Sequence, residues 1–263
     1  MTSTYSKTGK THVIDVIGTR HGVGATTNAL MLAIAGAHRG FAVRLHTNDH
    51  SIDFTAQAVG SKISTGVASI RQISPIESFH ADGFGGSIEF ETTAPTRDTE
   101  DHGVDIVVVD HSADLYDLTL LRALQFDATH TRVICCDAGD LSSLRRIETA
   151  PDFDEMIVRT PWAEDGFIDI VTLTDIDDDL PLFEATCEEY DLLLSEELAQ
   201  SWRKKSDAEL AFALRLWDAP VHSVQESDII RASSSLGLLE QSQVTYKSDL
   251  FKAALDIIDG TGA

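Results

Sequence analysis

The residues with the clearest chemical potential in this chain are closely spaced glycines and threonines near its beginning. Gly22 and Gly24 precede Thr26 and Thr27, in a segment that follows the β-branched run at 13–17. Glycines let a backbone come close to a phosphate group, and the first amides of a following helix point at it. A threonine hydroxyl in such a loop binds the magnesium ion that accompanies the phosphates. The spacing therefore indicates a phosphate-binding loop, with Thr26 as a candidate magnesium ligand.

This loop lacks the lysine that normally completes the motif. Phosphate-binding loops usually end in Gly-Lys-Ser or Gly-Lys-Thr, whereas Ala25 occupies the lysine position here. Ala25 cannot bring positive charge to the outer phosphates. A Gly-Lys-Thr sequence does occur at 9–11, but it precedes the strand, and the motif has to lie between strand and helix. We therefore interpret 1–11 as a flexible polar tail.

A regular alternation of strand and helix patterns should position the loop. We predict a strand over 13–17, a loop over 18–25, a helix over 26–39 and a second strand over 43–46. A strand, a helix and a strand within so short a stretch predict a parallel unit with a right-handed crossover.

Further strands and helices are predicted along the rest of the chain. The unbroken apolar runs at 105–110 and 132–137 are typical of strands buried on both faces of a parallel sheet. The alternating segment 87–92 predicts an antiparallel edge strand. The remaining candidates are strands over 156–158, 168–171 and 221–224, and helices over 117–125, 140–149, 229–238 and 247–258.

Together these patterns predict a single α/β domain over 1–263, with a three-layer, doubly wound, mostly parallel sheet. The segment 174–210 differs from its surroundings, because an acidic stretch is followed by apolar residues at helical spacing, and we predict an acidic helical insert there. Ligands of such sheets bind beyond the carboxyl ends of the strands. The loops 18–25, 47–51 and 110–114 should meet at that edge.

The loop sequence from Arg20 to Thr27, Arg-His-Gly-Val-Gly-Ala-Thr-Thr, resembles the deviant phosphate loop Lys-Gly-Gly-x-Gly-Lys-Thr-Thr of the ParA/MinD partition and positioning ATPases. Arg20 falls on that family's signature lysine, which reaches across a dimer to the partner's nucleotide. His21 falls on its first glycine, and Ala25 falls on the ordinary lysine. The resemblance implies the following nucleotide-binding positions: Arg20, His21, Gly22, Val23, Gly24, Ala25, Thr26, Thr27 and Asp49.

Two later stretches also resemble motifs of the family, each in altered form. The segment 39–49 resembles a strand that ends Asp-x-Asp, but Thr47 replaces the first aspartate, which positions water, and Asp49 matches the second. The segment 107–115 resembles the third motif and retains its aspartate as Asp110, a candidate magnesium ligand together with Thr26. The resemblance thus implies a nucleotide site that has kept Gly22, Gly24 and its candidate metal ligands Thr26 and Asp110, and has lost both lysines.

These losses predict little ATP hydrolysis. A hydrogen bond to a charged group contributes about 1.5–3 kcal/mol, so the loss of one such lysine weakens nucleotide affinity roughly ten- to hundredfold. The resemblance implies a homodimeric segregation, positioning or scaffold factor, for plasmid or chromosome partition, conjugation or placement of a polar machine. We expect ATP or ADP with magnesium to bind weakly or not at all.

Three alternatives stay open. The chain could be a slow but active ATPase that uses Arg20, or a partner-binding module without nucleotide that acts through 174–210. A transition metal could also bind where histidines and aspartates share the three loops. The residues concerned are His21, His46 or His50, Asp49, Asp110 and His111.

Charge narrows the range of partners. The 263 residues include 43 acidic and 20 basic ones, for a net charge of -23. Such a charge disfavours direct binding to DNA. It could instead serve to bind a basic protein partner, to provide general solubility or to adapt the protein to high salt. The polar N-terminus, the lack of an apolar run of membrane-spanning length and three cysteines without zinc-ligand spacing favour a cytoplasmic protein.

Overall fold

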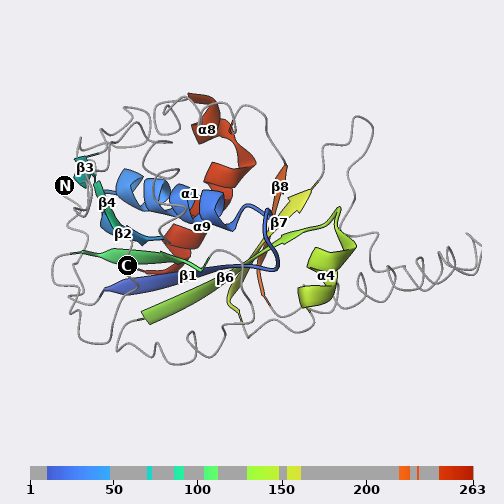
Figure 1. Ribbon diagram of the computed structural model, residues 1–263. Helices are drawn as coiled ribbons and strands as arrows, with labels where there is room; N and C mark the ends of the chain where they lie inside the picture. The colour runs from blue at the N-terminus through green and yellow to red at the C-terminus, as the bar shows by residue number, and fades with distance from the viewer. Residues whose placement is uncertain are drawn as a thin grey trace, which may run out of the picture.

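The computed structural model describes residues 11–47, 70–72, 86–91, 104–111, 129–147, 153–160, 219–225, 230 and 243–262. These residues form an eight-stranded sheet in the order β3-β4-β2-β5-β1-β6-β7-β8 (Figure 1). The strands are β1 (His12–Gly18), β2 (Ala42–His46), β3 (Ile70–Gln72), β4 (Ser87–Glu91), β5 (Ile106–Asp110), β6 (Thr129–Asp137), β7 (Glu155–Thr160) and β8 (Val221–Gln225). The helices are α1 (Ala25–His38), α4 (Leu141–Ile147), α8 (Gln243–Lys247) and α9 (Asp249–Gly260).

All strand pairings are parallel except that of β3 with β4. The chain places β5, β2 and β4 on one side of β1 and β6, β7 and β8 on the other. The strand order therefore reverses at β1, the strand that leads into the glycine loop. A loop at such a point lies in the crevice where ligands of doubly wound sheets bind.

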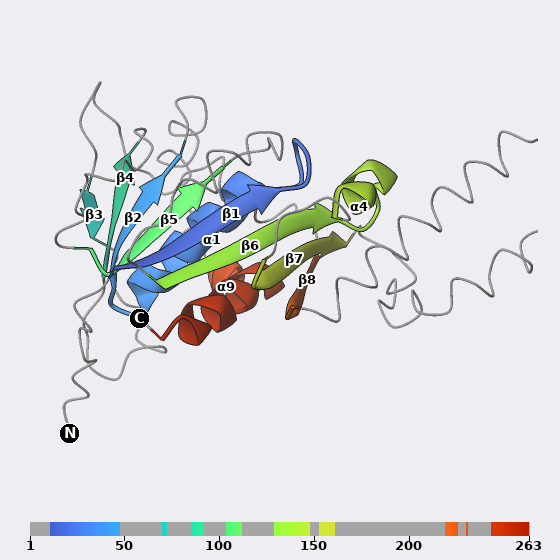
Figure 2. The ribbon, with the colours of Figure 1, turned by 90° about the horizontal axis from the view of Figure 1, so that it is seen from below.

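Helices cover both faces of the sheet, as Figure 2 shows from below. The adjacent residues Cys135 and Cys136 of β6 show how the layers are divided. Cys135 belongs to the large cluster under α1 and α9, whereas Cys136 packs with Leu144 and Ile147 of α4. Successive side chains of a strand point to opposite faces, so an unbroken apolar run indicates a strand covered on both sides. The predicted three-layer α/β fold is confirmed.

One predicted strand has different neighbours from those expected. The segment 87–92 is predicted as an antiparallel edge strand, and β4 does pair antiparallel with β3. However, β4 also pairs in parallel with β2, so it lies inside the sheet and β3 forms the edge. Its alternation has another cause. Ile88 and Phe90 are buried in the cluster of α1, whereas the Glu89 carboxylate accepts a hydrogen bond from Arg44 Nε of β2 at 2.8 Å. A charged pair on one face of the sheet produces the same pattern as an exposed edge.

The closing helix predicted over 247–258 is divided in two. Helix α8 ends at Lys247, and Ser248 begins α9 by accepting a hydrogen bond from the Phe251 amide at 3.1 Å. A serine in this position satisfies an amide that the helix itself leaves unpaired. The buried His38 of α1 hydrogen-bonds the Tyr246 hydroxyl at 2.8 Å, which ties the end of the chain to α1.

Several predicted features lie outside the described residues. They are the tail at 1–10, Asp49 and His50, the helix over 117–125, the strand over 168–171, the insert at 174–210 and, apart from Ile230, the helix over 229–238. In the part of the chain that the structure describes, none of the helices has the length and apolar character needed to cross a membrane.

Candidate functional site

The glycine loop has the backbone shape of a phosphate-binding loop. It connects the end of β1 at Gly18 with the start of α1 at Ala25, and Gly22 and Gly24 adopt φ angles of 83° and 90°. These angles lie in the left-handed region that glycine tolerates best. A Cβ atom added at Gly24 would meet no other atom within 4 Å, so the space in front of the first turn of α1 is open. The first amides of a helix of this length, which has fourteen residues, favour a phosphate group placed before its first turn.

The position of the missing lysine is part of the hydrophobic core. Ala25 is 6% exposed and belongs to the cluster of α1, together with Val23, which is 2% exposed. A Cβ atom added at Gly18 would come within 3.2 Å of the Ala25 Cβ and 3.1 Å of Val23 Cγ2. The loop thus packs tightly on its inner side, while His21 and Gly22 are exposed at its tip.

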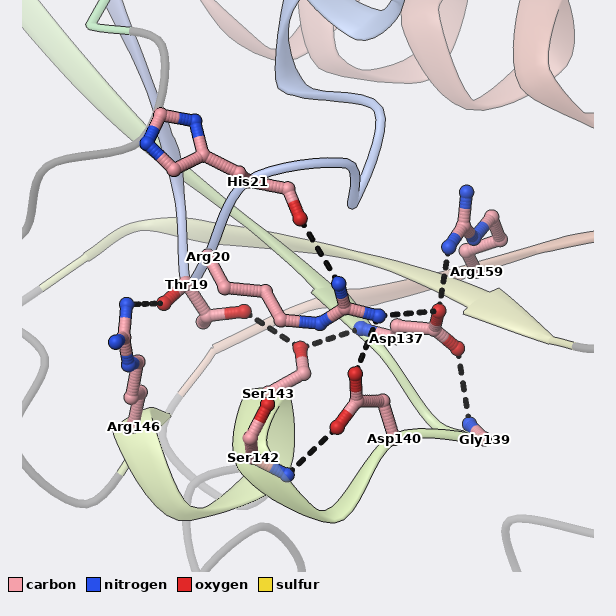
Figure 3. A network of polar contacts seen from close by, with 10 residues as sticks. All are labelled: Thr19, Arg20, His21, Asp137, Gly139, Asp140, Ser142, Ser143, Arg146 and Arg159. Atoms are coloured by element: carbon pink, nitrogen blue, oxygen red, sulfur yellow. Dashed lines mark hydrogen bonds and ion pairs between the residues drawn. The ribbon is translucent and has the colours of Figure 1, made fainter.

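The beginning of the loop is fixed to the corner between β6 and α4. The hydroxyl groups of Thr19 and Ser143 share a hydrogen bond of 2.6 Å, and Ser143 Oγ also accepts one from the Asp137 amide at 2.8 Å. Arg146 Nη1 of α4 donates to the Thr19 carbonyl at 2.9 Å. Since Thr19 and Ser143 are fully buried, these contacts hold loop and helix in one arrangement (Figure 3).

The Arg20 side chain runs along this corner. Its Nη1 donates to the His21 carbonyl at 2.9 Å, and its Nη2 forms an ion pair with Asp140 and lies 3.6 Å from Asp137 Oδ2. Arg159 of β7 pairs with the same oxygen of Asp137 (Figure 3). The one cation among the predicted nucleotide-binding positions is therefore engaged by carboxylates of its own chain.

Asp140 is negatively charged in this arrangement. Partial burial acts to raise its pKa, but hydrogen bonds from Ser142 and Ser143 together with the charge of Arg20 outweigh it and lower the pKa below the usual value. The Ser142 amide donates to Asp140 Oδ1 at 2.7 Å. Asp140 therefore remains an anionic partner for Arg20 at neutral pH.

One candidate magnesium ligand begins a helix and the other ends a strand. Thr26 lies in the first turn of α1, and Asp110 ends β5, which pairs with β1 so that Val16 lies beside Asp110. Hydroxyl and carboxylate oxygens are the ligands that magnesium prefers, and these residues fit such an ion. Thr47 Oγ1 donates to Asp110 Oδ2 at 3.2 Å, and both residues are buried. Thr47 thus places a neutral hydroxyl beside Asp110, at the position where the resemblance implies the first aspartate of Asp-x-Asp.

The described histidines of these loops, His21, His46 and His111, form no cluster of metal ligands. His111 Nε2 lies 2.7 Å from Oδ1 of Asp15, a residue of β1. His21, by contrast, is exposed at the tip of the loop. Among the described residues, no three histidine, cysteine, aspartate or glutamate side chains are grouped as metal ligands. Asp49 and His50 lie outside these residues.

The structure brings the loop from Arg20 to Thr27 and Asp110 to the same edge of the sheet, because β1 and β5 are parallel neighbours (Figure 2). The sequence reading missed Asp137 and Asp140. A signal for the first was present, because Asp137 ends a buried strand just as Asp110 does. Asp140 starts the turn into α4, and no comparable sequence pattern marks it as a site residue.

Comparison with known proteins supports the fold rather than a close relationship. No protein-family model matches the sequence, and no curated protein matches it. Among solved structures, the MinD cell division protein of Aquifex aeolicus is 12% identical with a TM-score of 0.50, over 95% of each chain. The same organism's MinC:MinD complex gives 12% identity and a TM-score of 0.51, over 94% of this chain and 96% of that one. A ParA family ATPase from Chlorobium tepidum is 14% identical with a TM-score of 0.47, over 95% and 98%.

The MinD structures share the fold described above over nearly the whole chain. The arrangement of strands, the glycine loop after β1 and the helices on both faces define a three-layer α/β fold of the kind seen in the MinD structures.

Proposed function

We propose that this chain is a ParA/MinD-like positioning or scaffold factor whose loop binds a nucleotide with little or no hydrolysis. One observation carries the proposal. The loop keeps the backbone shape that holds phosphates, while Ala25 is buried at the lysine position and Arg20 is bound by Asp140. Backbone amides and a helix dipole favour phosphate binding. Hydrolysis additionally needs a cation that stabilises the negative charge on the phosphate oxygens in the transition state.

The metal ligands of the site support binding rather than turnover. Thr26 and Asp110 would hold a magnesium ion, which when bound would neutralise charge on the phosphate oxygens. Thr47 donates a hydrogen bond to Asp110 and has no carboxylate with which to orient a water molecule. The chain would therefore stay in its nucleotide-bound form and hydrolyse the nucleotide slowly.

Charge and architecture guide the choice of partner. A net charge of -23 disfavours DNA and favours a basic protein surface. The structurally similar MinD was solved in a complex with MinC, which supports a role in binding a protein partner. We propose that the chain forms a homodimer over the nucleotide and presents an acidic surface to such a partner in the cytoplasm.

Calorimetry and phosphate release test the proposal directly. We expect titration with ATP and magnesium to show binding, and phosphate release to stay at the level of a blank without protein. Thr26→Ala should weaken binding of magnesium-ATP by roughly ten- to hundredfold, as expected for one lost interaction with a charged group. Thr261→Ala is the matched control, because its hydroxyl donates to the Ile258 carbonyl at the end of α9, away from the loop.

Two other outcomes would favour the alternatives. Steady phosphate release that disappears in Arg20→Ala would establish the slow ATPase. Absence of any heat change with ATP, ADP or magnesium would favour a module that binds partners without nucleotide. Light scattering with and without magnesium-ATP tests the dimer, and a monomeric mass under both conditions would count against it.

A further inference from the structure

We propose that Asp140 is a positioning residue that holds Arg20 within its own subunit, so that a bound polyphosphate has to displace Asp140 before Arg20 can reach it. This inference rests on the proposed function and concerns the regulation of the same site. Arg20 belongs to the glycine loop, and Asp140 begins the turn into α4. The ion pair between them therefore connects the loop to a separate element of the fold (Figure 3).

The carboxylate side of this contact is fixed independently of Arg20. Asp140 Oδ1 accepts a hydrogen bond from the Ser142 amide at 2.7 Å, and its carbonyl accepts from the amides of Ser143 and Leu144 at 3.0 Å each. Asp140 thus starts α4 and would keep its place if Arg20 left. The movable partner is the long side chain of Arg20, which is 30% exposed.

The guanidinium group is incompletely satisfied in its present position. Nη1 and Nη2 have the partners described above, but Nε is buried and has no hydrogen-bond acceptor among the described residues. A guanidinium group offers a fork of donors that suits the oxygens of a phosphate in a bidentate contact. A polyphosphate in front of the loop can therefore offer Arg20 a better set of acceptors than the β6–α4 corner does.

Departure of Arg20 would leave no buried carboxylate without a partner. Asp137 keeps its ion pair with Arg159 and the amide of Gly139, which donates to Asp137 Oδ1 at 3.0 Å. Asp140 is 28% exposed, so that water can replace the guanidinium. Ion pairs of such partial exposure contribute little to stability, which makes the contact reversible. The ion pair between Arg20 and Asp140 therefore has the features of a contact that can be released, and not those of a fixed structural contact.

The test is a calorimetric titration with two probes, magnesium-ATP and inorganic tripolyphosphate. Asp140→Asn removes the competing charge, and we expect it to bind both probes about two- to fivefold more tightly than the unmodified chain does. Asp140→Glu preserves the charge and should restore the original affinity. In the Arg20→Ala background, Asp140→Asn should have no further effect, because the residue it releases is absent.

A matched control accounts for the change in overall charge. Asp249→Asn removes one negative charge from the exposed start of α9, where Asp249 pairs with Lys252, and should leave both affinities unchanged. The inference is overturned if Asp140→Asn binds no more tightly than the unmodified chain. It is also overturned if the gain persists in the Arg20→Ala background or is matched by Asp249→Asn.

The two probes separate this inference from the proposed function. If the unmodified chain binds magnesium-ATP and Asp140→Asn gains nothing, the function stands and the inference fails. If Asp140→Asn binds tripolyphosphate more tightly than the unmodified chain but the unmodified chain binds no magnesium-ATP, the inference stands and the proposed nucleotide binding fails. If no variant binds either probe, both are wrong. Thermal unfolding of each variant confirms that it is folded before titration.

Discussion

His12 is a buried titratable residue at the start of the central strand. Its side chain lies 2.9 Å from the Thr131 hydroxyl, and burial lowers the pKa of His12 from 6.5 to about 4. The charge of the neighbouring His130 acts in the same direction, and that of Asp154 acts against it. The folded chain therefore holds His12 neutral where the unfolded chain would protonate it.

This difference predicts a loss of stability on acidification. Between about pH 6.5 and pH 4 the unfolded chain binds a proton that the folded chain does not, so the free energy of unfolding falls by at most about 1.4 kcal/mol per pH unit. Urea unfolding at pH 7.5 and pH 5 measures the loss. We expect His12→Asn to lose about 1–2 kcal/mol less than the unmodified chain over this interval. Equal losses in the two proteins would contradict the assignment.

At this scale the sequence predicted the position of the loop between a strand and a helix, but not the contacts of its side chains. Gly22, Gly24 and Thr26 could be recognised because a phosphate loop is a local pattern between one strand and one helix. The partners of Arg20 could not, because Asp137 and Asp140 lie more than a hundred positions away along the chain. An ion pair between elements depends on how the elements pack, and spacing in the sequence does not encode that.

Helix α1 packs on the sheet through a residue that has no side chain. Gly36 faces β2, and a Cβ atom added there would lie 2.9 Å from Val43 Cγ2. A glycine inside a helix normally costs about 0.5–1 kcal/mol relative to alanine, whereas overfilling a packed core costs about 1–3 kcal/mol. Because the second effect is larger, the close approach of α1 to β2 requires a glycine.

We therefore expect Gly36→Ala to lower the free energy of unfolding by about 1 kcal/mol, despite the better helix propensity of alanine. Gly260→Ala is the matched control in α9, because a Cβ atom added there would meet nothing within 4 Å. That variant should be neutral or slightly more stable. Urea unfolding of both variants measures the difference, and a Gly36→Ala protein as stable as the control would refute the packing argument.

Among the elements, the buried strands could be predicted best from the sequence. Which strands pair with one another could be predicted least. The runs in β5 and β6 are apolar on both faces and could be recognised without knowing what covers them. The placement of β4 failed because alternation has two causes, an exposed face or a charged pair on that face. Only the contact between Arg44 and Glu89 distinguishes them, and it joins two strands that are distant in sequence.

The whole molecule carries far more negative than positive charge. Its 43 acidic residues outnumber its 20 basic ones by a margin that gives a net charge of -23, so most carboxylates have no cation available in the chain. Self-repulsion in the compact state lowers stability, and dissolved salt screens it over a Debye length of about 10 Å at 0.1 M. Salt also weakens ion pairs such as that of Arg39 with Asp259, which acts in the opposite direction.

This imbalance predicts that salt stabilises the protein. We expect the midpoint of thermal unfolding to rise by several degrees between about 0.01 M and 0.3 M sodium chloride, because repulsion among carboxylates is then largely screened. Above that range screening has little left to remove, so simple repulsion predicts a plateau. A rise that continues into molar salt would instead indicate adaptation to high salt through an organised layer of cations and water. A midpoint that falls with added salt would show that the ion pairs stabilise the fold more than repulsion among carboxylates destabilises it. The net charge would then not determine the salt dependence of stability.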